Sequence, residues 1–142
     1  MNINWLTERV EFPADIDKER CMRWLDAVAA AHGKICGTLT YIFTDDEGIL
    51  KVNREFLQHD YYTDIITFDY SKRRMVSGDI YISLDTVRSN AAQFSTDPVR
   101  ELHRVVAHGL LHLCGIDDKG PGEREIMEAH ENDALNLLDR TL

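Results

Sequence analysis

The sequence predicts a single α+β domain, in which several helices pack on a small mixed sheet of about four strands. Three observations support this class. Short β-rich segments alternate with longer segments of helical spacing along the chain. Two predicted strands, about 63–70 and 76–83, are joined by a short basic connection that favours antiparallel pairing. The 142 residues are close to the usual size of one domain, so we treat 1–142 as one unit.

The first half of the chain predicts two strands and two helices. The first ten or so residues favour an edge strand, and residues from about 16 to 31 place apolar side chains at helical spacing. Residues 36–44 alternate and are rich in β-branched and aromatic side chains, which predicts a second strand. Asp45 or Asp46 could cap a helix that runs to about Leu57.

Three more helices are predicted after the 63–70 and 76–83 strands. The first runs from Asp85 to about residue 94. The second begins at Thr96-Asp97-Pro98, a capping side chain followed by proline, and runs to Cys114, where Gly115 ends it. The last covers about 123–138 and carries an apolar stripe.

Composition restricts the function more than it identifies it. A net charge of −9 argues against broad non-specific binding to nucleic acids or anionic membranes, although a local basic groove remains compatible with it. No apolar run approaches the ~18 residues of a membrane span, and no secretory signal is evident at the start. The three widely spaced cysteines do not suggest a disulfide framework. We therefore expect a cytoplasmic protein.

Residues 108–123, HGLLHLCGIDDKGPGE, carry the chemistry. His108 and His112 are four residues apart, so on a helix they lie about 40° apart around the axis and one turn along it. Both rings can then reach one ion at ~2.0–2.1 Å. The alternative is an ordinary amphipathic helix with two part-buried, hydrogen-bonded histidines.

The turn after this helix brings acidic side chains toward the histidines. Asp118 is our preferred third ligand, with Asp117 and Glu123 as the other candidates. Two imidazoles and one carboxylate leave a position open, which is the layout of catalytic rather than structural zinc. Such an ion could polarise a phosphoryl or carbonyl oxygen and lower the pKa of bound water. Zinc proteases have a glutamate base in HExxH where this chain has Gly109, which disfavours peptide hydrolysis.

The run H-G-x-L-H-L-x-G-x-D resembles the signature of the YbeY family of rRNA maturation endoribonucleases. Residues 52–70, VNREFLQHDYYTDIITFDY, and 77–83, SGDIYIS, are similar to two further segments of that family. The resemblance implies a zincin-like α+β fold, a zinc ion held by three histidines, cleavage of single-stranded RNA, maturation of the 3′ end of 16S rRNA and a part in ribosome quality control. It also implies that rRNA, the small ribosomal subunit and ribosome-associated factors are partners.

The chain departs from the family pattern at two positions. His108 and His112 match the first two ligands, but the third position is Asp118 instead of histidine. Aspartate is a competent zinc ligand, but it is shorter and charged. Leu57 stands where the resemblance implies an important arginine, and we hypothesise that Arg54 takes over that catalytic role.

The resemblance thus favours a zinc-dependent endoribonuclease that holds one ion and is expected to be a monomer. The alternative is a non-catalytic, metal-containing ribosome-assembly factor, and both departures favour that alternative somewhat.

Two other aspartates are candidates for supporting roles. For Asp64 we expect a structural role near a strand entry, with a polar contact in the cleft as the alternative, and for Asp79 a role in orienting a ligand histidine or capping a turn.

Overall fold

The computed structural model describes residues 2–57 and 63–142. The elements are, in order, β1 (Asn2–Thr7), α1 (Lys18–Ala31), β2 (Ile35–Thr44), α2 (Asp46–Phe56), β3 (Ile65–Asp69), β4 (Met75–Ser83), α3 (Leu84–Gln93), α4 (Pro98–Leu113) and α5 (Glu123–Asp139). The predicted α+β class is confirmed, and the predicted elements are found within about two residues of their expected bounds, except that the first strand ends at Thr7, about three residues early. No helix in the described ranges has the length and apolar character needed to cross a membrane.

The four strands form one mixed sheet in the order β1-β2-β4-β3. β1 is parallel to β2, and β2 is parallel to β4. β3 pairs antiparallel with β4, with Thr67 opposite Ile80, so the predicted hairpin is confirmed. β1 lies at one edge of the sheet, as its sequence favoured, and β3 lies at the other.

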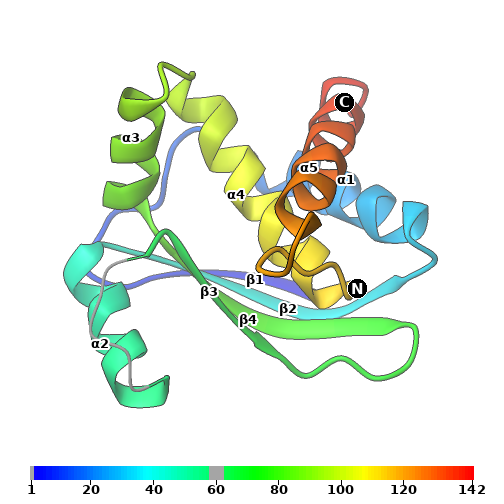
Figure 1. Cartoon of the computed structure of the whole chain (residues 1–142), viewed down its shortest axis with the longest axis horizontal. Helices are drawn as coiled ribbons and strands as arrows, with labels where there is room; N and C mark the ends of the chain where they lie inside the picture. The colour runs from blue at the N-terminus through cyan, green and yellow to red at the C-terminus, as the bar shows by residue number, and fades with distance from the viewer. Residues whose placement is uncertain (1, 58–62) are drawn as a thin grey trace.

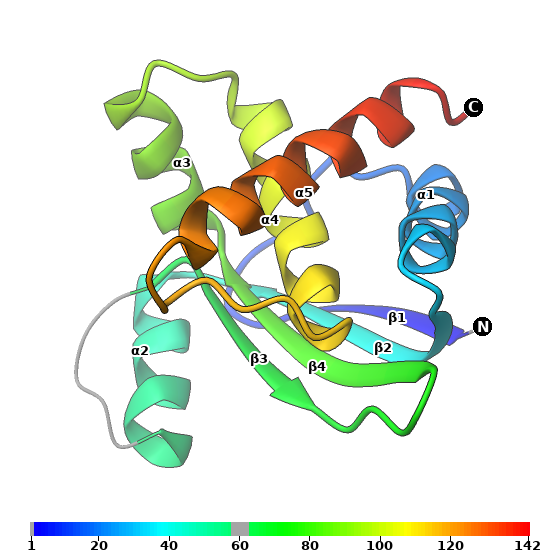
Figure 2. The same cartoon turned by 45° about the vertical axis from the view of Figure 1, so that its right-hand side comes forward.

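The helices divide unequally between the two faces of the sheet. α1, α4 and α5 gather on one face, whereas α2 lies beyond the other face at one end (Figures 1 and 2). Alternation along β4 explains this division, because Ile80 and Ile82 enter the main core while Tyr81 points the other way. Tyr81 packs instead in a small cluster with Ile49 and Val52 of α2.

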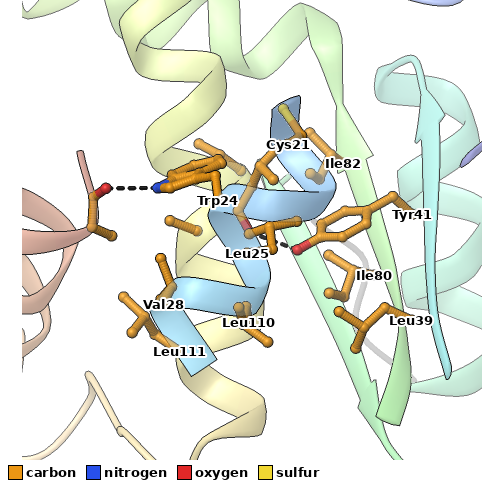
Figure 3. Packing of buried hydrophobic residues seen from close by; sticks show 14 of the residues in the cluster. Cys21, Trp24, Leu25, Val28, Leu39, Tyr41, Ile80, Ile82, Leu110 and Leu111 are labelled. Atoms are coloured by element: carbon orange, nitrogen blue, oxygen red, sulfur yellow. Dashed lines mark hydrogen bonds between the residues drawn. The ribbon is translucent and has the colours of Figure 1, made fainter. Parts of the chain in front are cut away.

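The main core is closed by aromatic side chains whose polar atoms are satisfied. The buried Trp24 indole donates a hydrogen bond to the carbonyl of Ala134 in α5 at 2.7 Å, and the Tyr41 hydroxyl donates to the carbonyl of Val106 in α4 at 2.9 Å. Figure 3 shows both rings among the aliphatic side chains between the helices and the sheet. These bonds tie α4 and α5 to the rest of the core without leaving the polar atoms of the two rings unpaired.

α4 begins and ends where the sequence predicted. The Asp97 side chain accepts a hydrogen bond from the Val99 amide at 3.1 Å, and Pro98 occupies the first turn. At the other end, Gly115 adopts φ +97°, and the amides of Gly115 and Ile116 bond back to the carbonyls of His112 and Leu111. This left-handed turn sends the following acidic segment back along the helix.

Gly109 is explained by the sheet rather than by a ligand. A Cβ at this position would lie 2.8 Å from Cγ2 of Ile80 and 3.2 Å from Cδ1 of Ile65. Both contacts belong to strands, β4 and β3, on which α4 packs. The absence of a side chain therefore lets the histidine-bearing turn of α4 approach the sheet closely.

We predict that Gly109→Ala destabilises the protein. Overpacking costs about 1–3 kcal/mol and the gain in helix propensity returns about 1 kcal/mol, so we expect a net loss of up to about 2 kcal/mol. Urea unfolding measures the change. Asn136→Ala, at an exposed position of α5, gains helix propensity without packing and should leave stability unchanged or slightly raised. Equal stability of Gly109→Ala and the parent protein would contradict this explanation.

Candidate metal centre

Three side chains converge at the C-terminal end of α4. The Nε2 atoms of His108 and His112 lie 3.3 and 3.5 Å from the same atom, Oδ2 of Asp118. The two rings are 4.5 Å apart between centroids and nearly perpendicular. Among the described residues, this is the one group of His, Cys, Asp and Glu whose potential ligand atoms all lie within 4.8 Å of one another.

Local structure explains why these three side chains meet. The spacing of four residues puts both histidines on one side of α4, while the leucines between and beside them are buried. The turn at Gly115 then reverses the chain, so that Asp118 comes back over the last turn of the helix. All three side chains keep a partial exposure of 17–24%, which leaves them accessible from one side.

The donor set fits a small transition-metal ion. In a tetrahedral site with donors at ~2.0–2.1 Å, neighbouring donors lie about 3.3–3.4 Å apart. The two measured separations to Asp118 are 3.3 and 3.5 Å, so little rearrangement is needed. Two imidazoles and a carboxylate are also a ligand set that zinc accepts, and they leave a coordination position for solvent or substrate. The group could therefore hold a metal ion.

The two other candidate ligands from the sequence lie nearby but outside this group. Asp117 is exposed, and Glu123, the first residue of α5, extends toward Gly120. Both line the same cleft as the histidines. Their positions favour a role in the rim of the cleft and leave Asp118 as the preferred third ligand.

A second carboxylate contacts His108 at Nδ1, the ring nitrogen that does not face Asp118. The Nδ1 atom of His108 lies 2.5 Å from Oε2 of Glu131, which projects from α5. The other carboxylate oxygen, Oε1, accepts a hydrogen bond from Arg104 at 3.0 Å. Glu131 is buried, with 8% of its surface exposed, whereas the side chain of Arg104 is 27% exposed, so this ion pair lies at the wall of the cleft.

The surroundings move the pKa values of the two histidines in opposite directions. Burial works against the charged form of His108, but the hydrogen bond to Glu131 and the charges of Glu131, Asp118 and Asp64 outweigh it and raise its pKa. Burial and the neighbouring charge of His108 lower the pKa of His112. The two rings thus differ electrostatically, although they occupy equivalent positions on successive turns.

A cleft of about 970 Å³ opens over the three donors. Its wall includes β3, the segment 117–119 and the first turns of α5. The charged part of its lining is mainly acidic, with the carboxylates Asp64, Glu101, Asp117, Asp118, Glu123, Glu128 and Glu131 against the cations Arg104, Lys119 and Arg124. A cation bound between the histidines would offset part of this negative charge.

The two aspartates with predicted supporting roles have different positions. Asp64 lines the cleft, where burial raises the pKa of its carboxyl, and its backbone carbonyl accepts a hydrogen bond from the Ser83 amide. Asp79 lies on the other face of β4 and accepts a hydrogen bond from the Tyr70 hydroxyl at 3.3 Å. The prediction that Asp79 orients a ligand histidine is therefore wrong, because strand alternation turns its side chain away from α4.

The carboxylate that contacts one of these histidines is instead that of Glu131, which the sequence analysis missed. One signal was present. Glu131 lies four residues after Met127 and four before Leu135, so it stands within the buried stripe of α5. A glutamate at such a position is unusual unless it is paired. Its partner on α4 could not be identified without the angle between the two helices.

The proposed arginine substitute lies on α2. Arg54 is exposed, and it is Asn53 and Leu57, on either side of it along the chain, that line the cleft. Leu57 therefore occupies a cleft position. The role suggested for Arg54 stays a prediction.

Comparison with known proteins identifies close relatives. The profile of the family "Endoribonuclease YbeY" matches residues 2–139. A Phocaeicola vulgatus protein of that name is 62% identical over 136 residues, covering 96% of this chain and 98% of that protein. A Porphyromonas gingivalis protein of the same name is 49% identical over 140 residues, covering 99% and 92%. The solution structure of TM1509 from Thermotoga maritima matches with a TM-score of 0.67 and 25% identity, covering 96% of this chain and 88% of that one.

We predict that the choice among the three acidic candidates can be made by metal content. Asp118→Ala and His108→Ala should each lower zinc affinity by at least 100-fold, because each removes a donor. Asp117→Ala and Glu123→Ala remove the same charge from the same cleft and should stay within a few fold of the parent protein. Elemental analysis and competition with a chromophoric chelator measure this. Retention of full affinity by Asp118→Ala would exclude it as a ligand.

Proposed function

Because the chain belongs to the YbeY endoribonuclease family, we propose that it is a zinc-dependent, single-strand-specific endoribonuclease that matures the 3′ end of 16S rRNA and acts in ribosome quality control. The observation that supports this most directly is the convergence of His108, His112 and Asp118 on one side of α4, open to the cleft. The single domain, residues 1–142, would carry the whole activity.

A bound zinc ion would supply Lewis-acid polarisation of a phosphate oxygen at the scissile bond. The protein's own part is to hold the donors rigidly. α4 fixes both imidazoles through its packing on the sheet, and the turn at Gly115 fixes Asp118. Gly109 stands at the position where HExxH proteases have their glutamate base. The motif therefore favours a substrate other than a peptide.

Cations around the acidic cleft would guide the RNA backbone. Lys119 is exposed on the segment that carries Asp118, and Arg124 is exposed on the first turn of α5. Both line the cleft, so a phosphate near the metal site would have positive side chains on one flank. Arg54 on α2 would act from the opposite flank, next to Leu57. With a net charge of −9, affinity should depend on these few cations and be sensitive to salt.

The proposed partners follow from this substrate. We expect the protein to act in the cytoplasm as a monomer on rRNA of the small ribosomal subunit, in contact with ribosome-associated factors. The runner-up, a metal-containing assembly factor without catalysis, shares these partners. In the enzyme the metal would take part in RNA cleavage, whereas in the assembly factor it would only stabilise the fold. An experiment can separate these two roles.

We predict that His112→Ala abolishes cleavage of a single-stranded RNA that carries the sequence of the 3′ region of 16S rRNA. The physical reason is the loss of one of three metal donors, and the expected fall in kcat/KM is at least 100-fold. Cleavage products are followed on a denaturing gel with zinc-loaded protein. Circular dichroism of both proteins, with and without chelator, serves as the control.

The outcome distinguishes the two functions. Loss of cleavage in a protein that keeps its fold supports the enzyme. Unfolding of the parent protein by chelator, without cleavage before its addition, supports the assembly factor.

A second prediction concerns Arg54. Arg54→Ala should lower kcat/KM about tenfold and weaken the salt dependence of RNA binding, with a slope reduced by about 0.7 for one lost phosphate contact. Lys51→Ala, also exposed on α2, is the matched control and should change both quantities little. Unaltered cleavage and affinity in Arg54→Ala would remove it from the site.

A further inference from the structure

We infer that Glu131 is a positioning residue of the metal centre: its carboxylate fixes the orientation and tautomer of His108, and Arg104 holds that carboxylate in place. This inference rests on the proposed metal site but not on the identity of the substrate. It assigns a function to an ion pair between α4 and α5 that the reaction itself does not require.

The geometry around Glu131 leaves it little freedom. Oε2 lies 2.5 Å from Nδ1 of His108, and Oε1 accepts from Nη1 of Arg104 at 3.0 Å. The second guanidinium nitrogen of Arg104 donates to Oδ1 of Asn132 at 2.8 Å. Each carboxylate oxygen therefore has its own partner, and the arginine is fixed at two points.

The hydrogen bond selects the nitrogen that faces the ion. A neutral imidazole carries one N–H group, and in His108 the carboxylate of Glu131 favours that proton on Nδ1. The lone pair then resides on Nε2, the atom that lies 3.3 Å from Asp118. Support and metal binding thus use opposite sides of the same ring, as in the carboxylate–histidine pairs of known zinc sites.

The two histidines do not receive equal support. Among the ion pairs of the described residues, His112 has only Asp118, whereas His108 also has the carboxylate of Glu131. An anionic acceptor pulls the Nδ1 proton more strongly and makes Nε2 the more basic donor. We therefore expect His108 to be the stronger of the two imidazole ligands, and its strength to depend on Glu131.

The burial of Glu131 supports the same conclusion. Only 8% of its surface is exposed, and its neighbours along the stripe of α5, Met127 and Leu135, belong to the apolar core. A buried carboxylate is unfavourable unless it is paired, and apolar residues of similar size often replace such pairs without loss of stability. An apolar residue at position 131 would pack but could not orient His108.

The test measures metal affinity and ligand-field spectra of Glu131→Gln and Glu131→Ala. Glu131→Ala should weaken zinc binding about 10- to 100-fold and change the visible absorption of the cobalt-substituted protein. Glu131→Gln keeps a carbonyl acceptor for Nδ1 without the charge, so its affinity should fall between those of Glu131→Ala and the parent protein, at least threefold below the latter. Glu128→Ala and Glu128→Gln are matched controls, because Glu128 is exposed on α5 and lines the same cleft.

The possible results separate this inference from the proposed function. Zinc affinities of the Glu131 variants within twofold of the Glu128 controls would overturn the inference, whether or not RNA is cleaved. The expected order of affinities without RNA cleavage by any of the proteins would leave the inference standing and remove the endoribonuclease. If Glu131→Ala does not fold, as judged by circular dichroism of the zinc-free protein, Glu131→Gln against Glu128→Gln decides.

Discussion

The position of α4 between the sheet and α5 is the constraint on which the site depends. On one side, Gly109 lets the helix approach Ile80 and Ile65 of the sheet so closely that a single methyl group would not fit. On the other side, His108 and Arg104 reach Glu131 of α5. Because packing fixes the helix from the sheet side and an ion pair fixes it from the α5 side, its two histidines have little freedom to move relative to Asp118.

The charges around the candidate metal site are balanced in two steps. The donor group consists of two imidazoles, His108 and His112, and the carboxylate of Asp118, where the family resemblance implies three histidines. A carboxylate in place of the third imidazole removes one unit of positive charge from the loaded site, and Glu131 would remove another if Arg104 did not pair with it. The ion pair thus lets His108 gain an anionic partner without making the centre as a whole more negative.

Most of the fold could be predicted because its signals are local. Capping by Asp97, the proline after it and Gly115 define α4 from a few neighbouring residues, and the turn at Gly115 also brings Asp118 back toward the histidines. The failures are relations between elements. The role predicted for Asp79 is one that strand alternation forbids, and Glu131 was missed because its partner is 23 residues away on another helix. Its only local signal was a charged residue within an apolar stripe.

The acidic side chains that line the cleft would give a bound metal ion an electrostatic role in addition to its chemistry. Carboxylates outnumber cations among the described residues that line it, so without an ion the cleft repels a polyanion. Lys119 and Arg124 are exposed, whereas Asp64 and Glu101 are partly buried. An ion held by His108, His112 and Asp118 would add positive charge to this part of the cleft. Metal binding and RNA binding are therefore expected to be coupled, and a protein with this lining would engage single-stranded RNA productively only in its loaded form.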